Sequence, residues 1–294
     1  MKSPHYPVMY REVVELFAES SRKLFVDCTV GLGGHSGHIL RQIPGSAIAA
    51  IDVDEESLEL ARKNLGEFGR RVRFFKGDFT GLFERIPVSP AAVGGVLVDP
   101  GISQFQLKSP ERGFSHSLDG PLDMRKDRSA EVSAADVINR FPQDRLTEIF
   151  RDFGEVADSR ALAKRIVERR LFGPISSTVQ LRCLLEELSH RRPRKGETHP
   201  AAKVFQALRI FVNRELENLE TFLLRAGKSL GSGARIILLS YHSLEDRIFK
   251  NSLKRMAREG SVRILPPFPR FPSAVEIAEN PASRSAKLRV AEVA

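Results

Sequence analysis

The feature that most constrains the fold is a regular alternation between residues 23 and 99. Short apolar runs rich in β-branched residues alternate with amphipathic stretches, in the order KLFVD, SGHILRQI, SAIAAID, ESLELARKNL, VRFFKGD and GGVLVD. Apolar strands separated by helices are typical of a parallel sheet with helices on both faces. The sequence therefore predicts an α/β fold with a Rossmann-like sheet in this part of the chain.

Acidic residues follow three of these apolar runs. Asp27, Asp52 and Asp99 each stand at the end of a predicted strand. Parallel strands of an open α/β sheet bind ligands just outside their carboxyl ends. We therefore expect the three acids to lie along the rim of the sheet where a ligand binds.

The pattern changes after Asp99. Residues 101–128 are rich in Gly, Ser, Pro and charge, too long for an ordinary connection, and residues 129–199 have helical periodicity throughout. A long helical pattern then runs from residue 200 to about residue 230, followed by a strand RIILLS, a helix LEDRIFKNSLKRMA and an edge strand AKLRVAEV. The sequence predicts a discontinuous catalytic domain, residues 1–105 and 205–294, with an inserted all-helical domain at residues 106–204.

Composition excludes several classes of protein. The chain has 294 residues, 41% of them hydrophobic, which suffices for a core and about two domains. No apolar run approaches the roughly 18 residues of a membrane span, and the charged N-terminal segment does not look like a signal peptide. Cys28 and Cys183 are far apart and outside any C-x-x-C motif. We expect a cytoplasmic protein that is not membrane-bound.

The positive charge is concentrated in one segment. The net charge of +9 favours a polyanionic partner such as RNA, although many basic proteins bind no nucleic acid. Residues 129–159 contain 3 basic and 7 acidic residues, whereas residues 160–195 contain 10 basic and 3 acidic residues. Helical periodicity turns Lys164, Arg165 and Arg169 outward. This patch is either an RNA contact or an ordinary solvated helix face.

A glycine-rich loop joins the first predicted strand to the first helix. Its sequence VDCTVGLGGHSGH has Gly31-x-Gly33 but places Ser36 where the dinucleotide fingerprint requires a third glycine. Asp52 follows Gly31 by 21 residues, at a position suited to the ribose of any adenosine cofactor. The phosphate-binding G-x-x-x-x-G-K-[ST] motif is absent. We infer a nucleoside cofactor other than a P-loop nucleotide, and a purely structural turn is the alternative for this loop.

Two further acids have open interpretations. Asp78, followed by Phe79, is suited either to hydrogen bonding with an adenine amine or to a simple turn. The segment Asp99-Pro100-Gly101 partly resembles the D-P-P-Y motif of amino-methyltransferases, in which a carboxylate accepts hydrogen bonds from the target amine, but Ile102 replaces the aromatic residue. An Asp-Pro turn is the alternative for this segment.

Five motifs together have a more specific meaning than any one of them. In chain order they are GLGGHS (31–36), ERGFSHSLDGPLDMR (111–125), HPAAKVFQALRIFVNREL (199–216), LSYHSLEDR (239–247) and NPASRSAKLR (280–289). With this set, the chain from His5 to its C-terminus closely resembles the bacterial 16S ribosomal RNA cytosine-N4 methyltransferase family, ribosomal RNA small subunit methyltransferase H.

The resemblance implies a class I S-adenosylmethionine-dependent methyltransferase that modifies the N4 amine of one cytidine in the decoding region of small-subunit rRNA. By motif position it implies cofactor contacts from the glycine loop, the ribose-binding acid and three further residues: Gly33, Gly34, His35, Asp52, Phe79, Asp99 and Gln106. The family usually has D-L-G-V-S-S-x-Q where this chain has DPGISQFQ (99–106). The equal length keeps Gln106 aligned, while Pro100 and Gln104 depart from the pattern.

Candidates for catalysis and target binding follow from the resemblance and from the expected rim. Asp99 is the candidate catalytic acceptor for the target amine. Tyr241 and His242 come just after a strand and are candidates for the target pocket. Ser243 and Asp246 also have capping-box spacing, which offers a structural explanation of this motif.

The segment containing Asp123 and Arg125 either grips rRNA or closes over the cofactor, or is an ordered connector. No His or Cys group has metal-ligand spacing, so the sequence predicts no metal. Two alternatives to the methyltransferase are an NAD(P)-dependent oxidoreductase and a non-catalytic RNA-binding assembly factor. The sequence leaves open whether the protein is a monomer or a homodimer.

Overall fold

The computed structural model describes residues 7–188 and 200–294. The chain forms two compact units, the first comprising Met1–Gly101 and Leu216–Ala294, the second Ile102–Glu215. The domain boundaries predicted from the sequence, at residues 105/106 and 204/205, differ from this division. The difference arises mainly at the second boundary, because the helix that follows residue 199 contributes Val204, Phe205 and Leu208 to the core of the second unit.

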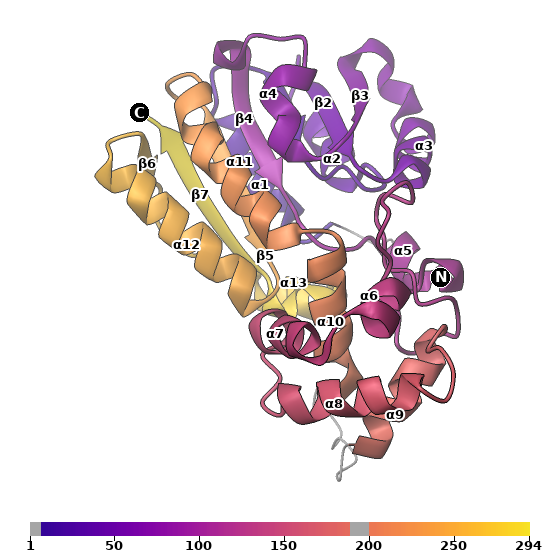
Figure 1. Cartoon of the computed structure of the whole chain (residues 1–294). Coiled ribbons are helices and arrows are strands. Elements are labelled where there is room, and N and C mark those ends of the chain that lie inside the picture. The colour runs from indigo at the N-terminus through magenta and orange to yellow at the C-terminus, as the bar shows by residue number, and fades with distance from the viewer. Residues whose placement is uncertain (1–6, 189–199) are drawn as a thin grey trace. The chain divides into compact units, whose positions relative to one another are not determined.

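The first unit is built on one mixed sheet (Figure 1). Its strands are β1 (Leu24–Asp27), β2 (Ala47–Asp52), β3 (Val72–Lys76), β4 (Val93–Val98), β5 (Arg235–Ser240), β6 (Val262–Ile264) and β7 (Lys287–Val293). Their order is β3-β2-β1-β4-β5-β7-β6. Strands β1 to β5 pair in parallel, and β7 pairs antiparallel with both β5 and β6. This topology confirms the predicted Rossmann-like class I methyltransferase sheet.

One expectation about the sheet edge is wrong. The last strand, β7, was expected at an edge, but it lies between β5 and β6 and is buried along most of its length. The edge strand at this end of the sheet is β6, whose three residues carry too short an apolar pattern to reveal a strand.

Helices pack on both faces of this sheet (Figure 1). One face meets α1 (Tyr10–Ala18), α2 (Gly34–Gln42) and α3 (Glu55–Asn64), and the other meets α4 (Leu82–Arg85), α11 (Glu215–Ser229) and α12 (Ser243–Arg258). Successive strand residues point to opposite faces, so Phe25 joins the first core and Val26 the second. The short helix α13 (Ala274–Glu279) precedes β7.

The second unit is helical in the part of it that the structure describes. It contains α5 (Gln104–Lys108), α6 (Ala134–Arg140), α7 (Gln143–Gly154), α8 (Ser159–Arg170), α9 (Thr178–Leu188) and α10 (Pro200–Val212). The apolar faces of α6 to α10 enclose a single core that includes Phe150, Ile166 and Leu208. The helices predicted between residues 129 and 188 are therefore confirmed. The described residues include no helix that is long and apolar enough to cross a membrane.

The long helix predicted from residue 200 to about residue 230 is two helices. The break falls at Asn213 and Arg214, and Arg214 has a left-handed backbone with φ of 49°. The Asn213 side-chain amide donates to the carbonyls of Met124 and Arg209, both at 2.8 Å, and its oxygen accepts from the Lys126 amide at 2.7 Å. These contacts to a distant loop hold the turn, a tertiary effect that helical periodicity does not contain.

Candidate active site

The glycine loop lies between β1 and α2. Gly31 and Gly33 have φ of 51° and 86°, a region that glycine adopts without steric cost. A Cβ on Gly33 would also lie 2.8 Å from the Leu65 side chain. Gly33 is the N-cap of α2 and has no side chain with which to cap the first amides of the helix. The loop is suited to bind an anionic group close to its backbone.

Ser36 has a structural reason to replace the third fingerprint glycine. It is fully buried, and its hydroxyl donates to Oδ2 of Asp27 at 2.7 Å. The backbone amide of Thr29 donates to Oδ1 of the same carboxyl at 3.2 Å. Burial raises the pKa of Asp27 to about 6. The first turn of α2 is thus tied to the end of β1 through a buried acid.

Asp52 is fixed at the carboxyl end of β2. Its Oδ2 accepts the Gly31 amide at 2.8 Å, and its Oδ1 accepts the Asp54 amide at 3.0 Å. These bonds hold the carboxylate beside the glycine loop, where it can accept hydrogen bonds from ribose hydroxyls. Loop amides next to a rim carboxylate form a donor and acceptor set that fits a nucleoside bearing an amino-acid group.

His35 lies in the first turn of α2 and is 7% exposed. Its Nε2 is 2.9 Å from the carbonyl oxygen of Val8. Because a carbonyl only accepts, Nε2 carries the hydrogen, and Nδ1 is left facing Oδ2 of Asp99 at 3.6 Å. The imidazole of His35 and the carboxyl of Asp99 therefore face each other in one polar environment.

Asp99 follows β4 at the same rim. Its amide donates to the Thr29 hydroxyl at 2.8 Å, and its Oδ1 accepts the hydroxyl of Tyr241 at 2.6 Å. Burial raises the pKa of Asp99, while His35 and the Tyr241 hydrogen bond act in the opposite direction. The side chain is 22% exposed, so it is both held in place and accessible to a ligand.

Tyr241 and His242 connect β5 to α12. The Tyr241 amide donates to Oε2 of Glu245 at 2.8 Å, and burial raises the pKa of the Tyr241 phenol, which stays a neutral donor. His242 is the N-cap of α12, and its Nδ1 accepts the Glu245 amide at 3.4 Å.

The predicted capping box of Ser243 and Asp246 is wrong, because the helix begins one residue earlier than that spacing requires. Asp246 instead pairs with Lys287 at 3.0 Å and Arg289 at 2.7 Å on β7.

Phe79 lies after β3, in a short 3-10 helix. Its ring packs edge-on against Phe222 of α11, with centroids 5.5 Å apart. Asp78 caps this helix by accepting from the amide of Thr80 at 2.8 Å and from its hydroxyl. Of the two interpretations of Asp78, the turn residue is the one that these contacts favour.

Gln106 belongs to the second unit, where it is 4% exposed. It forms a capping box with Ser103: its Oε1 accepts the Ser103 amide at 2.9 Å, and Ser103 Oγ accepts the Gln106 amide at 3.2 Å. Gln104, one of the departures from the family pattern, is the first residue of α5. The unusual DPGISQFQ segment therefore still forms a well-capped helix start.

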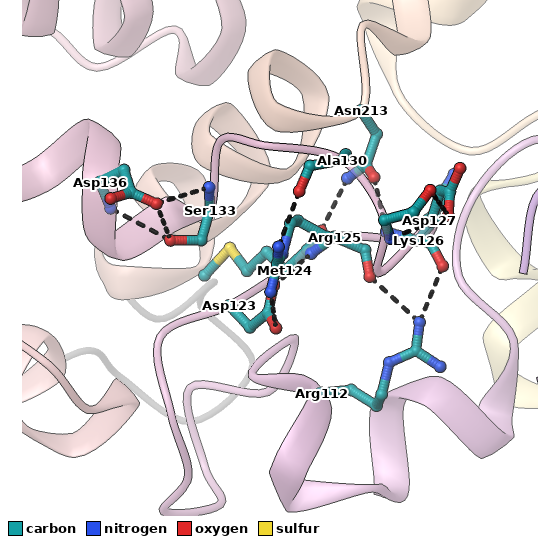
Figure 2. Close-up of polar contacts among 11 residues, drawn as sticks. Arg112, Asp123, Met124, Arg125, Lys126, Asp127, Ala130, Ser133, Asp136 and Asn213 are labelled. Carbon is teal, nitrogen blue, oxygen red and sulfur yellow. Dashed lines mark hydrogen bonds and ion pairs between the residues drawn. The ribbon is translucent and has the colours of Figure 1, made fainter.

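The segment containing Asp123 and Arg125 is held by its own polar contacts (Figure 2). Arg112 is 1% exposed and donates to the carbonyls of Arg125 and Lys126, both at 3.0 Å. Arg125 binds Asp123 through two bonds of 2.6 and 3.0 Å and donates to the carbonyl of Ala130 at 2.7 Å. Of the interpretations of this segment, the ordered connector fits these contacts. Target binding by Asp123 and Arg125 stays a prediction.

The basic patch predicted on the inserted domain lies on α8. Lys164 and Arg165 are 66% and 55% exposed, and both approach Glu168, at 3.8 and 3.2 Å. Arg169 is exposed as well. The remainder of the predicted basic region, residues 189–195, lies outside the described residues, as do His199 and His5. Glu168 thus offsets part of the positive charge of the α8 patch, which remains cationic.

Sequence reasoning missed the contacts that assemble the site. Nothing in the sequence paired Tyr241 with Asp99, which are 142 residues apart, or gave Val8 and Thr29 a place beside them. The available signal was that Asp99 and Tyr241 each follow a predicted strand. Only the adjacency of β4 and β5 turns that signal into a contact.

Comparison with known proteins adds a family to this geometry. The model of the MraW methylase family matches residues 2–294. The chain is 42% identical to a ribosomal RNA small subunit methyltransferase H of Thermotoga neapolitana over 98% of this chain and 96% of that protein. It is 44% identical to one of Trichormus variabilis, over 98% and 91%.

Among solved structures, an rRNA methylase from Streptococcus thermophilus aligns with a TM-score of 0.43 and 10% identity, over 96% of this chain and 94% of that one. The family match and the two relatives cover almost the whole chain. Together with the seven-stranded sheet, they show an S-adenosylmethionine-dependent methyltransferase. The chain belongs to the MraW methylase family.

Proposed function

We propose that this protein methylates the N4 amine of a specific cytidine in the decoding region of 16S rRNA, in the small ribosomal subunit. The names of its relatives support an rRNA substrate of the small subunit. The observation that carries the proposal is the accessible carboxyl of Asp99, fixed by Tyr241 at the rim beside the glycine loop. It is an acceptor suited to an exocyclic amine.

The rim residues divide the work of holding the cofactor. Asp52 accepts the ribose hydroxyls, the amides near Gly33 and Gly34 bind the carboxylate of the amino-acid group, and His35 buttresses the loop through Val8. Phe79 and Asp99 complete the proposed contacts of the first unit, while a cofactor contact of Gln106, in the second unit, stays a prediction from the family resemblance. When bound, S-adenosylmethionine supplies a methyl group on a positively charged sulfur.

The target amine is a poor nucleophile because its lone pair is delocalised into the cytosine ring. Asp99 accepts a hydrogen bond from this amine, which orients it and draws electron density toward nitrogen. With the cofactor bound, the bond from sulfur to the methyl carbon would break as the N–C bond formed, leaving its electron pair on the sulfur of S-adenosylhomocysteine, and the Asp99 carboxylate would take the amine proton and later release it to solvent. The raised pKa of Asp99 makes it a better proton acceptor than an ordinary carboxylate.

Tyr241 and His242 take different parts in this proposal. The Tyr241 hydroxyl is committed to Asp99, so we assign Tyr241 the orientation of that carboxyl, while its ring lines the target pocket. His242 flanks the pocket from the start of α12. Lys164, Arg165 and Arg169 bind the RNA phosphates from the second unit.

The two alternatives have less support. An NAD(P)-dependent oxidoreductase would require a close helix-strand contact at the third fingerprint glycine, where this chain has a buried serine bonded to Asp27. A non-catalytic assembly factor has no need for an accessible rim carboxyl with a raised pKa. A direct assay of methyl transfer distinguishes a non-catalytic assembly factor from a methyltransferase.

The test uses small subunits from a strain that lacks this gene. They are incubated with the purified protein and labelled S-adenosylmethionine, and the rRNA nucleosides are analysed by mass spectrometry. We expect label in N4-methylcytidine at one position. Subunits from the parent strain serve as the control and should accept no label. Label in another base, or none in any base, would refute the proposal.

A further inference from the structure

The turn that ends α8 holds two large apolar side chains in solvent. Leu171 is 79% exposed and Phe172 is 87% exposed. Leu162 and Ile166 of the same helix enter the core of the second unit, and the other exposed large apolar residues of its described part, Leu118 and Val132, are only 36% and 39% exposed. An adjacent pair of this size at such exposure is uncommon on a soluble domain and suggests a contact surface.

This turn is held firmly from both sides. The guanidinium of Arg170 donates to the carbonyls of Ile138 and Phe141, at 2.9 and 2.8 Å. After the turn, the Ile175 amide donates to Oδ1 of Asn139 at 2.9 Å, and Nδ2 of Asn139 donates to the Ile175 carbonyl at 2.8 Å. The exposed pair therefore sits on a fixed support between two anchors, which lowers the entropy lost when a ligand binds it.

The turn itself also has regular hydrogen bonds. The amides of Leu171, Phe172 and Gly173 donate to carbonyls three residues earlier, at 3.1 to 3.3 Å. Gly173 has φ of 136°, which lets the chain reverse immediately after Phe172. The aromatic ring stands at the tip of the turn as a result.

The exposed ring adjoins the basic patch. Arg165 and Arg169 lie one turn apart on α8, which ends at Arg170, and the Phe172 amide donates to the Arg169 carbonyl at 3.1 Å in the turn that follows. Glu168 is the single acid of α8, and it approaches Lys164 and Arg165. Among the residues that the structure describes, no acid pairs with Arg169, so its positive charge is uncompensated in the last turn of α8, next to the turn that holds Phe172.

The size and the charge of this surface indicate whether a protein or a nucleic acid binds it. A stable protein interface buries about 800 Å² on each partner, far more than two side chains supply. An aromatic ring flanked by cations is instead the arrangement that binds single-stranded nucleic acid, by stacking on a base and neutralising adjacent phosphates. Stacking does not depend on sequence, because each base has a flat π face.

We propose that Phe172 stacks on an unpaired base of the RNA substrate, with Arg165 and Arg169 on the neighbouring phosphates. This inference rests on the proposed function, since it takes RNA as the substrate. It assigns a contact on the inserted domain to a base that is not the methylated one. Leu171 packs beside the same base as an apolar edge.

The test separates stacking from general apolar contact. A fluorescently labelled, unstructured 12-nucleotide RNA is titrated with wild type, Phe172→Leu, Phe172→Ala and Phe172→Trp, and the Kd is read from anisotropy at two salt concentrations. We expect Phe172→Leu and Phe172→Ala to weaken binding about tenfold, and Phe172→Trp to keep wild-type affinity. The slope of binding against salt should not change, since no charge is altered.

Phe271→Leu is the matched control, because Phe271 is 62% exposed but belongs to the first unit. It should bind the RNA like wild type. Wild-type affinity of Phe172→Leu alongside weak binding of Phe172→Ala would show an apolar contact with the RNA that needs no aromatic ring, and would overturn stacking. Wild-type affinity of both variants, or an equal loss in Phe271→Leu, would overturn it too.

Methyl transfer to small subunits keeps the two proposals distinguishable. If the wild-type protein labels no small-subunit RNA, the proposed function fails irrespective of the Phe172 result. If it labels N4 of cytidine, Phe172→Leu should raise KM for subunits about tenfold and leave kcat unchanged. An unchanged KM would contradict the Phe172 contact alone.

Discussion

The phenolic hydroxyl of Tyr241 donates a hydrogen bond to Oδ1 of Asp99 across 2.6 Å. The two residues follow β5 and β4, which are parallel neighbours in the sheet. This bond fixes the orientation of the carboxyl plane, and the other oxygen, Oδ2, faces His35. The proposed acceptor of the target amine is thus positioned by a donor from an adjacent strand end.

Removing that donor should slow methyl transfer. In Tyr241→Phe the carboxyl keeps its charge but loses one strong hydrogen bond, so kcat should fall 10- to 100-fold while affinity for S-adenosylhomocysteine changes less than threefold. Single-turnover methylation and calorimetry measure the two quantities. Tyr10→Phe is the control, because its hydroxyl contacts the exposed Arg11 and lies outside the site. Equal effects in both variants would remove the positioning role.

Asp99→Asn should abolish most of the activity and its dependence on pH. Asparagine still accepts the Tyr241 hydroxyl but cannot take a proton, so we expect kcat to fall by at least about 100-fold. In wild type, kcat should rise with pH as Asp99 ionises, with a midpoint above the ordinary carboxyl value of 3.8, because burial raises this pKa. If kcat of Asp99→Asn still rose with pH at the same midpoint as wild type, the pH dependence would belong to another group.

Asp52→Asn should weaken cofactor binding specifically. The Asp52 carboxylate accepts hydrogen bonds from two backbone amides and, in the proposal, from the ribose hydroxyls. The asparagine side chain has only one acceptor oxygen for these donors. We expect the Kd for S-adenosylhomocysteine to rise about tenfold. Asp78→Asn is the matched control at the end of β3, where the side chain caps its own turn. A comparable loss in Asp78→Asn would revive the adenine contact for that acid.

Replacing Lys164, Arg165 and Arg169 with Glu should weaken RNA binding and also make it less dependent on salt concentration. Loss of about three phosphate contacts predicts a salt slope shallower by two to three units, with S-adenosylhomocysteine binding intact. Reversal of Lys250, Lys254 and Arg258, three exposed cations of α12 in the first unit, is the comparison. An equal reduction from that variant, or an unchanged slope in the α8 variant, would reduce the patch to a solvated helix face.

Asp27→Asn should change how stability depends on pH. The folded pKa of Asp27 is raised to about 6, above its ordinary value of 3.8, so the folded state favours the protonated acid. Its stabilising contribution is complete below pH 3.8 and is lost as pH rises through 6.

Urea unfolding between pH 4 and 7 should therefore show the variant gaining stability relative to wild type across that window. Asparagine keeps an acceptor for the Ser36 hydroxyl, so the helix start need not be lost. A difference between the two proteins that does not vary with pH would show that Asp27 does not titrate there.

Much of the first unit follows from local pattern. Strands that are apolar on both faces and helices with one apolar face predicted the parallel sheet. The acids Asp27, Asp52 and Asp99 stand at the carboxyl ends of β1, β2 and β4 as expected, although Asp27 is buried. The pattern failed where a segment was short or its conformation depended on distant contacts. Strand β6 has three residues, and the break after α10 depends on Asn213 bonding to Met124 in a loop 89 residues away.

The sequence by itself determined the order of elements, the glycine loop and the residues that end each strand, because periodicity, glycine and capping act over a few residues. Tertiary structure alone decided which of those residues act together. Tyr241 reaches Asp99 because β4 and β5 are adjacent in the sheet, Val8 binds His35, and Ser36 bonds to a buried Asp27. A hydrogen bond forms only between groups that packing brings within about 3 Å, and no local pattern records that distance.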